Sequence, residues 1–283
     1  MDFITWATSP WGRSVPTHLA WGLIWVAIIA GFFFVVTHTI YVALVAPKKT
    51  RHPVSATEAA VIPERVQRHS LTARMFHWIM ALSMLALLVT AFLPKVGVKF
   101  DWVTYHWIAG IALTVSVLFH IFHATLVLDF WSIWPDRIDA RDAMRRVTRF
   151  FGNPAPPADR FGKYPLENKL YHMVVMLAGL AVIGTGLFMM KRVDSIFKPR
   201  NPYLFSDMTW GMMYVLHGLA GVGFIALIIV HIYMGIRPEK LPITKSMIFG
   251  WMSRDFFLEE HDPKRWAGDS DAKKTGLAAS DAD

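Results

Sequence analysis

The stretch that decides the fold covers residues 212–236 and reads MMYVLHGLAGVGFIALIIVHIYMGI. It contains no Asp, Glu, Lys or Arg, but it carries two histidines, His217 and His231. A helix needs about 20 predominantly apolar residues to cross the hydrocarbon core of a bilayer. The stretch therefore predicts a transmembrane helix. Histidines inside such a helix are costly, so we expect them to face the protein interior and to have a function.

Four further apolar blocks are long enough to span a membrane, and they cover residues 18–45, 75–93, 105–128 and 170–190. Of the 283 residues, 54% are hydrophobic and 18% are charged, whereas soluble domains have about 25% charged residues. None of the blocks shows the alternation of apolar and polar residues that a transmembrane β-barrel requires. The sequence therefore predicts an all-α membrane protein with five transmembrane helices.

The charged residues and the absence of cysteine limit the function further. Without cysteine, the chain has no disulfide, no iron–sulfur ligand and no covalent heme attachment. The lysines and arginines are concentrated in residues 48–74, 137–169 and 237–274. The positive-inside rule places these segments in the cytoplasm, so we expect a periplasmic N-terminus and a cytoplasmic C-terminus. The net charge of +8 then indicates contact with anionic membrane lipid and not with nucleic acid.

The spacing of the two histidines in residues 212–236 indicates a cofactor arrangement. His217 and His231 are 14 residues apart, so they share one helix face and lie about 21 Å apart along the axis. Two hemes stacked across a bilayer, each with one ligand from this helix, need such a geometry. Neutral imidazole is a common ligand of heme iron.

The second ligand of each heme must come from another helix at the same depth. His106 begins its span on the same side as His217, so these two residues can share a heme. His77 begins its span at the opposite surface and can pair with His231. His120 is a rival for His77, because it lies 14 residues after His106 and matches the depth of His231. Four other histidines are expected to have structural roles: His18, His38, His123 and His172. Three more are expected to be exposed to solvent: His52, His69 and His261.

Two glycines accompany the predicted outer pair. Gly110 follows His106 in HWIAG, and Gly221 follows His217 in HGLAG. Residues i and i+4 lie on the same helix face, so each glycine leaves room for a flat macrocycle beside its histidine. The alternative is ordinary packing of small residues between membrane helices.

Seven motifs together resemble a known family: ARMFHW at 73–78, HWIAGIA from His106, WPDRID at 134–139, FGKY at 161–164, LHGLAGVGF around His217, VHIYMG around His231 and HDPKRW at 261–266. Over residues 72–266 the chain resembles the cytochrome b (gamma) subunit of membrane-bound respiratory formate dehydrogenases. Related cytochromes b serve hydrogenases and thiosulfate reductases. The resemblance implies a four-helix bundle with two heme b groups, the outer bound by His106 and His217 and the inner by His77 and His231. It thus favours His77 over His120.

The resemblance also implies an organisation of the chain. Residues 1–70 add an extra N-terminal transmembrane helix and a cytoplasmic linker, residues 71–266 form the diheme core, and residues 267–283 form a disordered cytoplasmic tail. The implied partners are a periplasmic iron–sulfur subunit and a molybdenum or tungsten catalytic subunit. The family's trimeric assemblies make a higher oligomer plausible, and the implied location is the bacterial inner membrane.

A quinone site is implied beside the inner heme. Its candidate residues are Tyr164, Asn168 and Lys169, whose alternative roles are a loop cap and a lysine that snorkels at a helix start. The chain departs from the family pattern in this loop, at Pro165, Glu167 and Asn168, so the polar contacts and the quinone type (menaquinone or ubiquinone) are open. Arg74 is a candidate partner of a heme carboxylate, or simply a topology-determining charge.

The function implied by the resemblance is an electron conduit from a periplasmic formate-oxidising enzyme to quinone at the cytoplasmic side. The chain itself has no motif for substrate oxidation, so we expect no catalytic residues in it. We expect it to act as the quinone-reactive subunit of the complex. One alternative is the same module serving a hydrogenase or another molybdoenzyme. A different alternative is a transporter whose intramembrane histidines relay protons.

Overall fold

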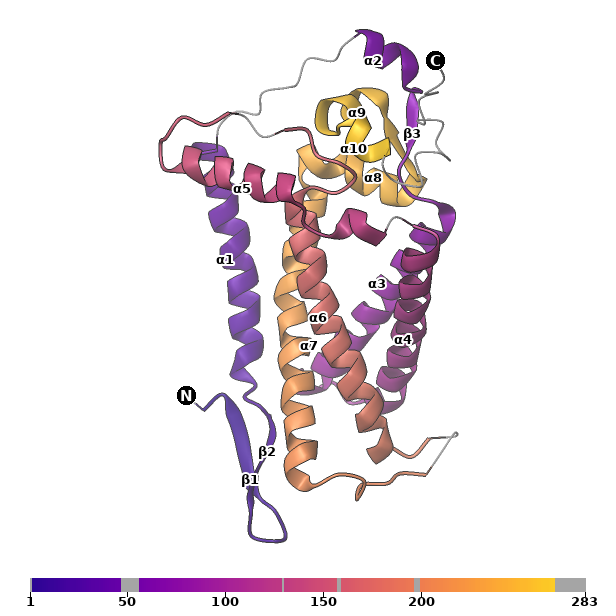
Figure 1. The fold of residues 1–283 in the computed structure, drawn as a ribbon. Helices are drawn as coiled ribbons and strands as arrows, with labels where there is room; N and C mark the ends of the chain where they lie inside the picture. The colour runs from indigo at the N-terminus through magenta and orange to yellow at the C-terminus, as the bar shows by residue number, and fades with distance from the viewer. Residues whose placement is uncertain (1, 47–55, 129, 157–158, 196–198, 268–283) are drawn as a thin grey trace. The chain divides into compact units, whose positions relative to one another are not determined.

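The computed structural model describes residues 2–46, 56–128, 130–156, 159–195 and 199–267 (Figure 1). Within these residues, five helices are long and apolar enough to cross a membrane: α1 (Gly22–Leu44), α3 (Leu71–Phe92), α4 (Trp102–Leu126), α6 (Leu166–Met189) and α7 (Asp207–Ile236). They confirm the predicted all-α membrane fold. Residues 47–55 of the predicted linker, with His52, and residues 268–283 of the predicted tail lie outside the described residues.

The chain divides into two compact units. The first unit comprises Met1–Pro47, His77–Val117 and Val175–Gly235, and therefore holds α1 and most of α3, α4, α6 and α7. The second unit comprises Lys48–Phe76, Leu118–Val174 and Ile236–Asp283. All four predicted heme ligands belong to the first unit, and all three candidate quinone contacts belong to the second.

A β-hairpin precedes the first long helix. Strands β1 (Ile4–Thr8) and β2 (Ser14–Leu19) pair antiparallel, and Gly12 in the turn adopts a φ of 76°. The predicted first span began at residue 18, but α1 begins at Gly22, because the residues before it continue the β-ladder. The hairpin packs against α7 through Leu19 and Gly218. A Cβ added at Gly218 would lie 3.4 Å from Cδ1 of Leu19.

Helix α1 packs along α7 within the same unit. At Gly31, an added Cβ would lie 3.0–3.2 Å from three side-chain atoms of Ile229, so the absence of a side chain permits this contact. About two turns further along α1, Nδ1 of His38 lies 3.0 Å from the Tyr233 hydroxyl. The hydroxyl of Thr39 lies 2.9 Å from the same Tyr233 hydroxyl. His38 thus has the structural role expected of it, and the extra helix is bound to the last span.

The second unit has a small soluble-type core. Strands β3 (Arg65–Gln67) and β4 (Trp251–Ser253) form a two-stranded sheet, accompanied by α2 (Ala56–Val61), α8 (Leu241–Phe249), α9 (Arg254–Glu260) and α10 (Pro263–Ala267). The buried apolar core consists of Ile62, Val66, Met252, Phe257, Leu258 and Trp266. This apolar burial is the main stabilising term of the unit.

Helix α5 (Arg137–Phe150) of the second unit begins with a capping box. The Asp136 carboxylate accepts from the backbone N–H of Asp139, and the Asp139 carboxylate accepts from that of Asp136. The buried Asp139 also accepts a 2.7 Å hydrogen bond from Nζ of Lys169 on α6. The Asp139 carboxylate therefore stabilises the first turn of α5 and also binds the lysine at the start of α6.

Candidate functional site

The structure brings His106 and His217 together. His106 lies in the second turn of α4 and His217 in the third turn of α7, and their ring centroids are 6.2 Å apart with an interplanar angle of 67°. The pairing predicted from depth and helix periodicity is thus present in the structure.

His77 and His231 form a second facing pair. His77 lies in the second turn of α3 and His231 near the end of α7, and their ring centroids are 6.5 Å apart. The rival residue His120 belongs to the second unit, where its ring stacks on Phe76 at 4.5 Å and lies 6.3 Å from the His172 ring. The ring of His77 faces that of His231 in the structure.

The separation within each pair suits one metal ion between two imidazoles. An imidazole nitrogen binds a transition metal at about 2.0–2.1 Å, so two rings on opposite sides of one ion have centroids about 6 Å apart. Among the described residues, no group of three or more His, Cys, Asp or Glu side chains could hold a metal ion. Two protein ligands per site fit heme iron, because the porphyrin supplies the other four nitrogens.

The space beside the outer pair also suits a flat macrocycle. A Cβ added at Gly221 would meet no atom within 4 Å, and one added at Gly110 would meet only Cδ2 of Leu87, at 3.9 Å. These two glycines therefore do not serve close helix packing in this structure. A third glycine, Gly186 on α6, does permit a close contact between helices, because a Cβ there would lie 3.3 Å from Cε1 of His217. The residues present fit a heme at this place.

Two threonines that the sequence analysis missed contact the outer histidines. The hydroxyl of Thr90 lies 2.9 Å from Nδ1 of His106, and the hydroxyl of Thr185 lies 2.9 Å from Nδ1 of His217. A signal was present in the sequence, because each threonine is a polar residue within an apolar span. Only the tertiary structure shows which threonines reach a histidine.

Comparison with known protein families gives a match over residues 68–250, to the model described as prokaryotic cytochrome b561. The match covers more than half of the chain and includes His77, His106, His217 and His231. The chain belongs to the prokaryotic cytochrome b561 family. It is therefore an integral membrane cytochrome b that binds heme b and transfers electrons. No curated protein sequence matches the chain significantly.

The candidate quinone residues of this cytochrome b561-family chain lie at the start of α6. Lys169 is not a snorkelling surface lysine, because it is only 4% exposed and its ammonium group is paired with Asp139. Tyr164 lies under the guanidinium of Arg68, 5.6 Å from it, and Asn168 is half-buried in the first turn of the helix. Of these three side chains, the lysine has a clear structural role.

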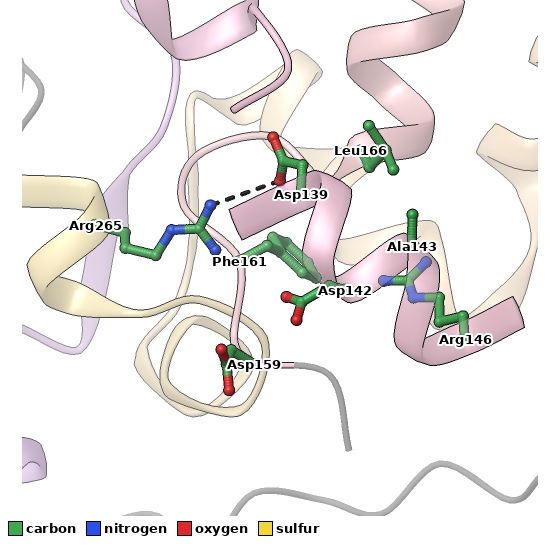
Figure 2. Close-up of a pocket in the computed structure, with 8 residues that line it drawn as sticks. All are labelled: Asp139, Asp142, Ala143, Arg146, Asp159, Phe161, Leu166 and Arg265. Atoms are coloured by element: carbon green, nitrogen blue, oxygen red, sulfur yellow. Dashed lines mark ion pairs between the residues drawn. The ribbon is translucent and has the colours of Figure 1, made fainter. Parts of the chain in front are cut away.

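A small pocket lies next to this cluster, lined by Asp139, Asp142, Arg146, Asp159 and Arg265 among others (Figure 2). Figure 2 shows the guanidinium of Arg265 directed at Asp139, with which it pairs at 3.5 Å. The pocket has a volume of about 10 Å³, which is about the space of one water molecule. It is too small for a quinone ring.

Arg68 connects the loop before α6 to the C-terminal helices. It is buried and donates to the Lys163 carbonyl at 2.9 Å, while one of its nitrogens lies 3.3 Å from Nε2 of His261. Burial lowers the pKa of Arg68 to about 10, although the nearby Tyr164 opposes this shift. The expectation that His69 and His261 are solvated is wrong, because both are buried: His69 accepts from Arg68, and Nδ1 of His261 lies 2.6 Å from the Gly162 carbonyl.

Arg74 has a contact that neither sequence interpretation included. Its guanidinium donates to the Ile248 carbonyl at 2.5 Å and lies against Gly250, whose φ is 90°. Since Ile248 is in the last turn of α8, the arginine satisfies a carbonyl that the helix leaves without a partner. Arg74 also lines a second pocket of about 260 Å³, together with Arg65 and His69.

Proposed function

We propose that this chain is the membrane cytochrome b subunit of a respiratory formate dehydrogenase-like complex and that it holds two heme b groups. One observation carries the proposal: α7 contributes a histidine at each of two depths, and each faces a histidine from another helix at 6.2 or 6.5 Å. The two positions on α7 are 14 residues apart, or about 21 Å along the helix.

The four histidines have the role of axial ligands in this proposal. His106 and His217 would hold a heme near the N-terminal end of α7, and His77 and His231 one near its C-terminal end. Bound heme b supplies one-electron oxidation and reduction, whereas the protein supplies position and electrostatics.

The sidedness of the proposal rests on charge. The lysines and arginines are concentrated in residues 48–74, 137–169 and 237–274, so we place these segments on the cytoplasmic side and the N-terminus in the periplasm. Electrons would enter from a periplasmic iron–sulfur subunit, whose partner oxidises formate at molybdenum or tungsten. They would leave to quinone at the cytoplasmic side of a bacterial inner membrane.

The quinone contacts in this proposal are Tyr164 and Asn168. Both are half-buried at the start of α6, and their hydroxyl and amide groups can donate to a quinone carbonyl. Lys169 would hold the start of the helix through Asp139 and would not itself bind quinone.

The test is purification of the assembled complex from its native membrane. Subunits are identified by mass spectrometry, heme is quantified, and formate-dependent quinone reduction is assayed. Two hemes per chain with a formate-oxidising partner would support the full proposal. Two hemes with a hydrogenase or another molybdoenzyme would retain the conduit and refute the formate partnership. A heme-free chain would refute the conduit and favour the proton-relay transporter.

A further inference from the structure

We infer that Thr90 and Thr185 are positioning residues, each of which fixes the tautomer and orientation of one histidine of the outer pair. The inference rests on the proposed function, because it assigns a reason for the fixed tautomer: the Nε2 atoms of His106 and His217 are left unprotonated and free to bind heme iron. The threonines themselves would not touch the iron.

The hydrogen bonds at Thr90 determine which nitrogen of His106 carries the proton. The hydroxyl of Thr90 donates its one hydrogen to the Ala86 carbonyl, 2.7 Å away, one helical turn earlier. Its oxygen then has only lone pairs to offer to Nδ1 of His106, 2.9 Å away. Nδ1 must therefore be the donor. The hydroxyl also lies 3.1 Å from the Leu87 carbonyl, a second group that can only accept this hydrogen.

Thr185 repeats the arrangement on another pair of helices. Its hydroxyl lies 2.5 Å from the Ala181 carbonyl and 2.9 Å from Nδ1 of His217. The hydroxyl also lies 3.4 Å from the Val182 carbonyl, which can likewise only accept. In neutral imidazole, a protonated Nδ1 leaves the lone pair on Nε2. Both rings of the outer pair therefore present the nitrogen that binds a metal.

The contacts differ from the usual behaviour of threonine in an apolar helix. Threonine hydroxyls in such helices commonly bond only to the carbonyl four residues earlier, as Thr114 does to Gly110 at 2.7 Å. Thr90 and Thr185 make the same bond and also meet a histidine, and both are at least 90% buried. A threonine of α3 contacts a histidine of α4, and a threonine of α6 contacts a histidine of α7. The two helix pairs therefore have the same threonine–histidine contact.

A hydrogen bond from the distal nitrogen of a ligating histidine fixes the ring and raises its basicity, and its loss commonly weakens metal binding 10- to 100-fold. A more basic imidazole favours ferric over ferrous iron. Removing the acceptor should therefore raise the midpoint potential of the outer heme. The potential of the inner heme, bound by His77 and His231, should not change.

The test compares Thr90→Val, Thr185→Val and the double variant in the assembled complex, with Thr114→Val as the matched control. Optical redox titration gives the two heme potentials, and low-temperature electron paramagnetic resonance reports the ligand field of each ferric heme. We expect one of the two potentials to rise and one ferric signal to shift in each test variant, with a larger effect in the double variant. Thr90→Ser and Thr185→Ser, which keep the hydroxyl, should restore both readouts.

Three results would overturn the inference. Two unchanged potentials in the double variant would show that the threonines do not act on the heme ligands. An equal shift in Thr114→Val would show that the effect comes from the helix and not from the histidine contact. A wild-type complex without heme would refute the proposed function and this inference together. Two normal hemes in the wild type, with unchanged potentials and unchanged ferric signals in the threonine variants, would refute the inference alone.

Discussion

Replacing Gly221 by leucine separates a heme site from ordinary helix packing. A Cβ at this position meets no protein atom within 4 Å, so protein packing alone gives no penalty. Leucine in place of a glycine inside a helix gains about 0.8–1 kcal/mol of helix propensity. If only protein surrounds Gly221, the variant should be slightly more stable than the wild type. If a heme lies beside His217, the leucine side chain occupies its place, and the heme content should fall from two per chain to one.

Gly223→Leu is the matched control for this substitution. It lies on the same helix, an added Cβ there also meets no atom within 4 Å, and two residues on places it on roughly the opposite helix face. The assay is heme quantitation per mole of chain by the pyridine hemochrome method, with the melting temperature measured on the same samples. Gly223→Leu should retain both hemes. The reasoning is refuted if Gly221→Leu also retains both, or if both variants lose heme equally.

Further predictions concern stability outside the heme sites. Lys169→Met should destabilise the second unit by about 3 kcal/mol, because it removes the ammonium group that is paired with the buried Asp139 carboxylate at 2.7 Å; an unchanged denaturant midpoint would contradict this. Gly31→Ala should lower the melting temperature, since overpacking against α7 costs about 1–3 kcal/mol and the helix-propensity gain is about 1 kcal/mol; a higher melting temperature would refute the close contact. For Asp136, burial raises the pKa, but the hydrogen bond from the Asp139 backbone and the charges of Lys169 and Arg265 lower the pKa below its usual value overall. Its stabilising effect should be present above pH about 4 and be lost as pH falls further, so Asp136→Asn should flatten the acid limb of a stability–pH profile; parallel profiles would refute it.

The parts of the fold that the sequence predicted well depend on periodicity. Apolar length alone located the five spans, because a helix in lipid must satisfy its own backbone hydrogen bonds. The helical repeat of 3.6 residues then gave the shared face and relative depth of His217 and His231. Depth matching paired His106 with His217, and the structure places their ring centroids 6.2 Å apart. It left His120 as a rival of His77, since depth does not specify the direction from which a helix approaches.

The features that the sequence did not predict depend on contacts between distant segments. The β1–β2 hairpin has its place because Leu19 packs on Gly218 of α7, about 200 residues later. The sequence left Lys169 as a quinone contact or a snorkelling lysine, whereas in the structure it is buried and paired with Asp139 of another helix. The roles of Thr90 and Thr185 likewise required the neighbouring helix. In each case the residue type was visible in the sequence, and its partner was not.

The most direct test of the central claim is heme quantitation with electron paramagnetic resonance on single histidine variants of the purified complex. The account predicts two low-spin hemes in the wild type. His106→Ala and His217→Ala should abolish one low-spin signal, and His77→Ala and His231→Ala should abolish the other. His120→Ala should retain both signals. Loss of a signal in His120→Ala with retention in His77→Ala would contradict the assigned pairs, and a wild type with a single heme would contradict the two-site arrangement itself.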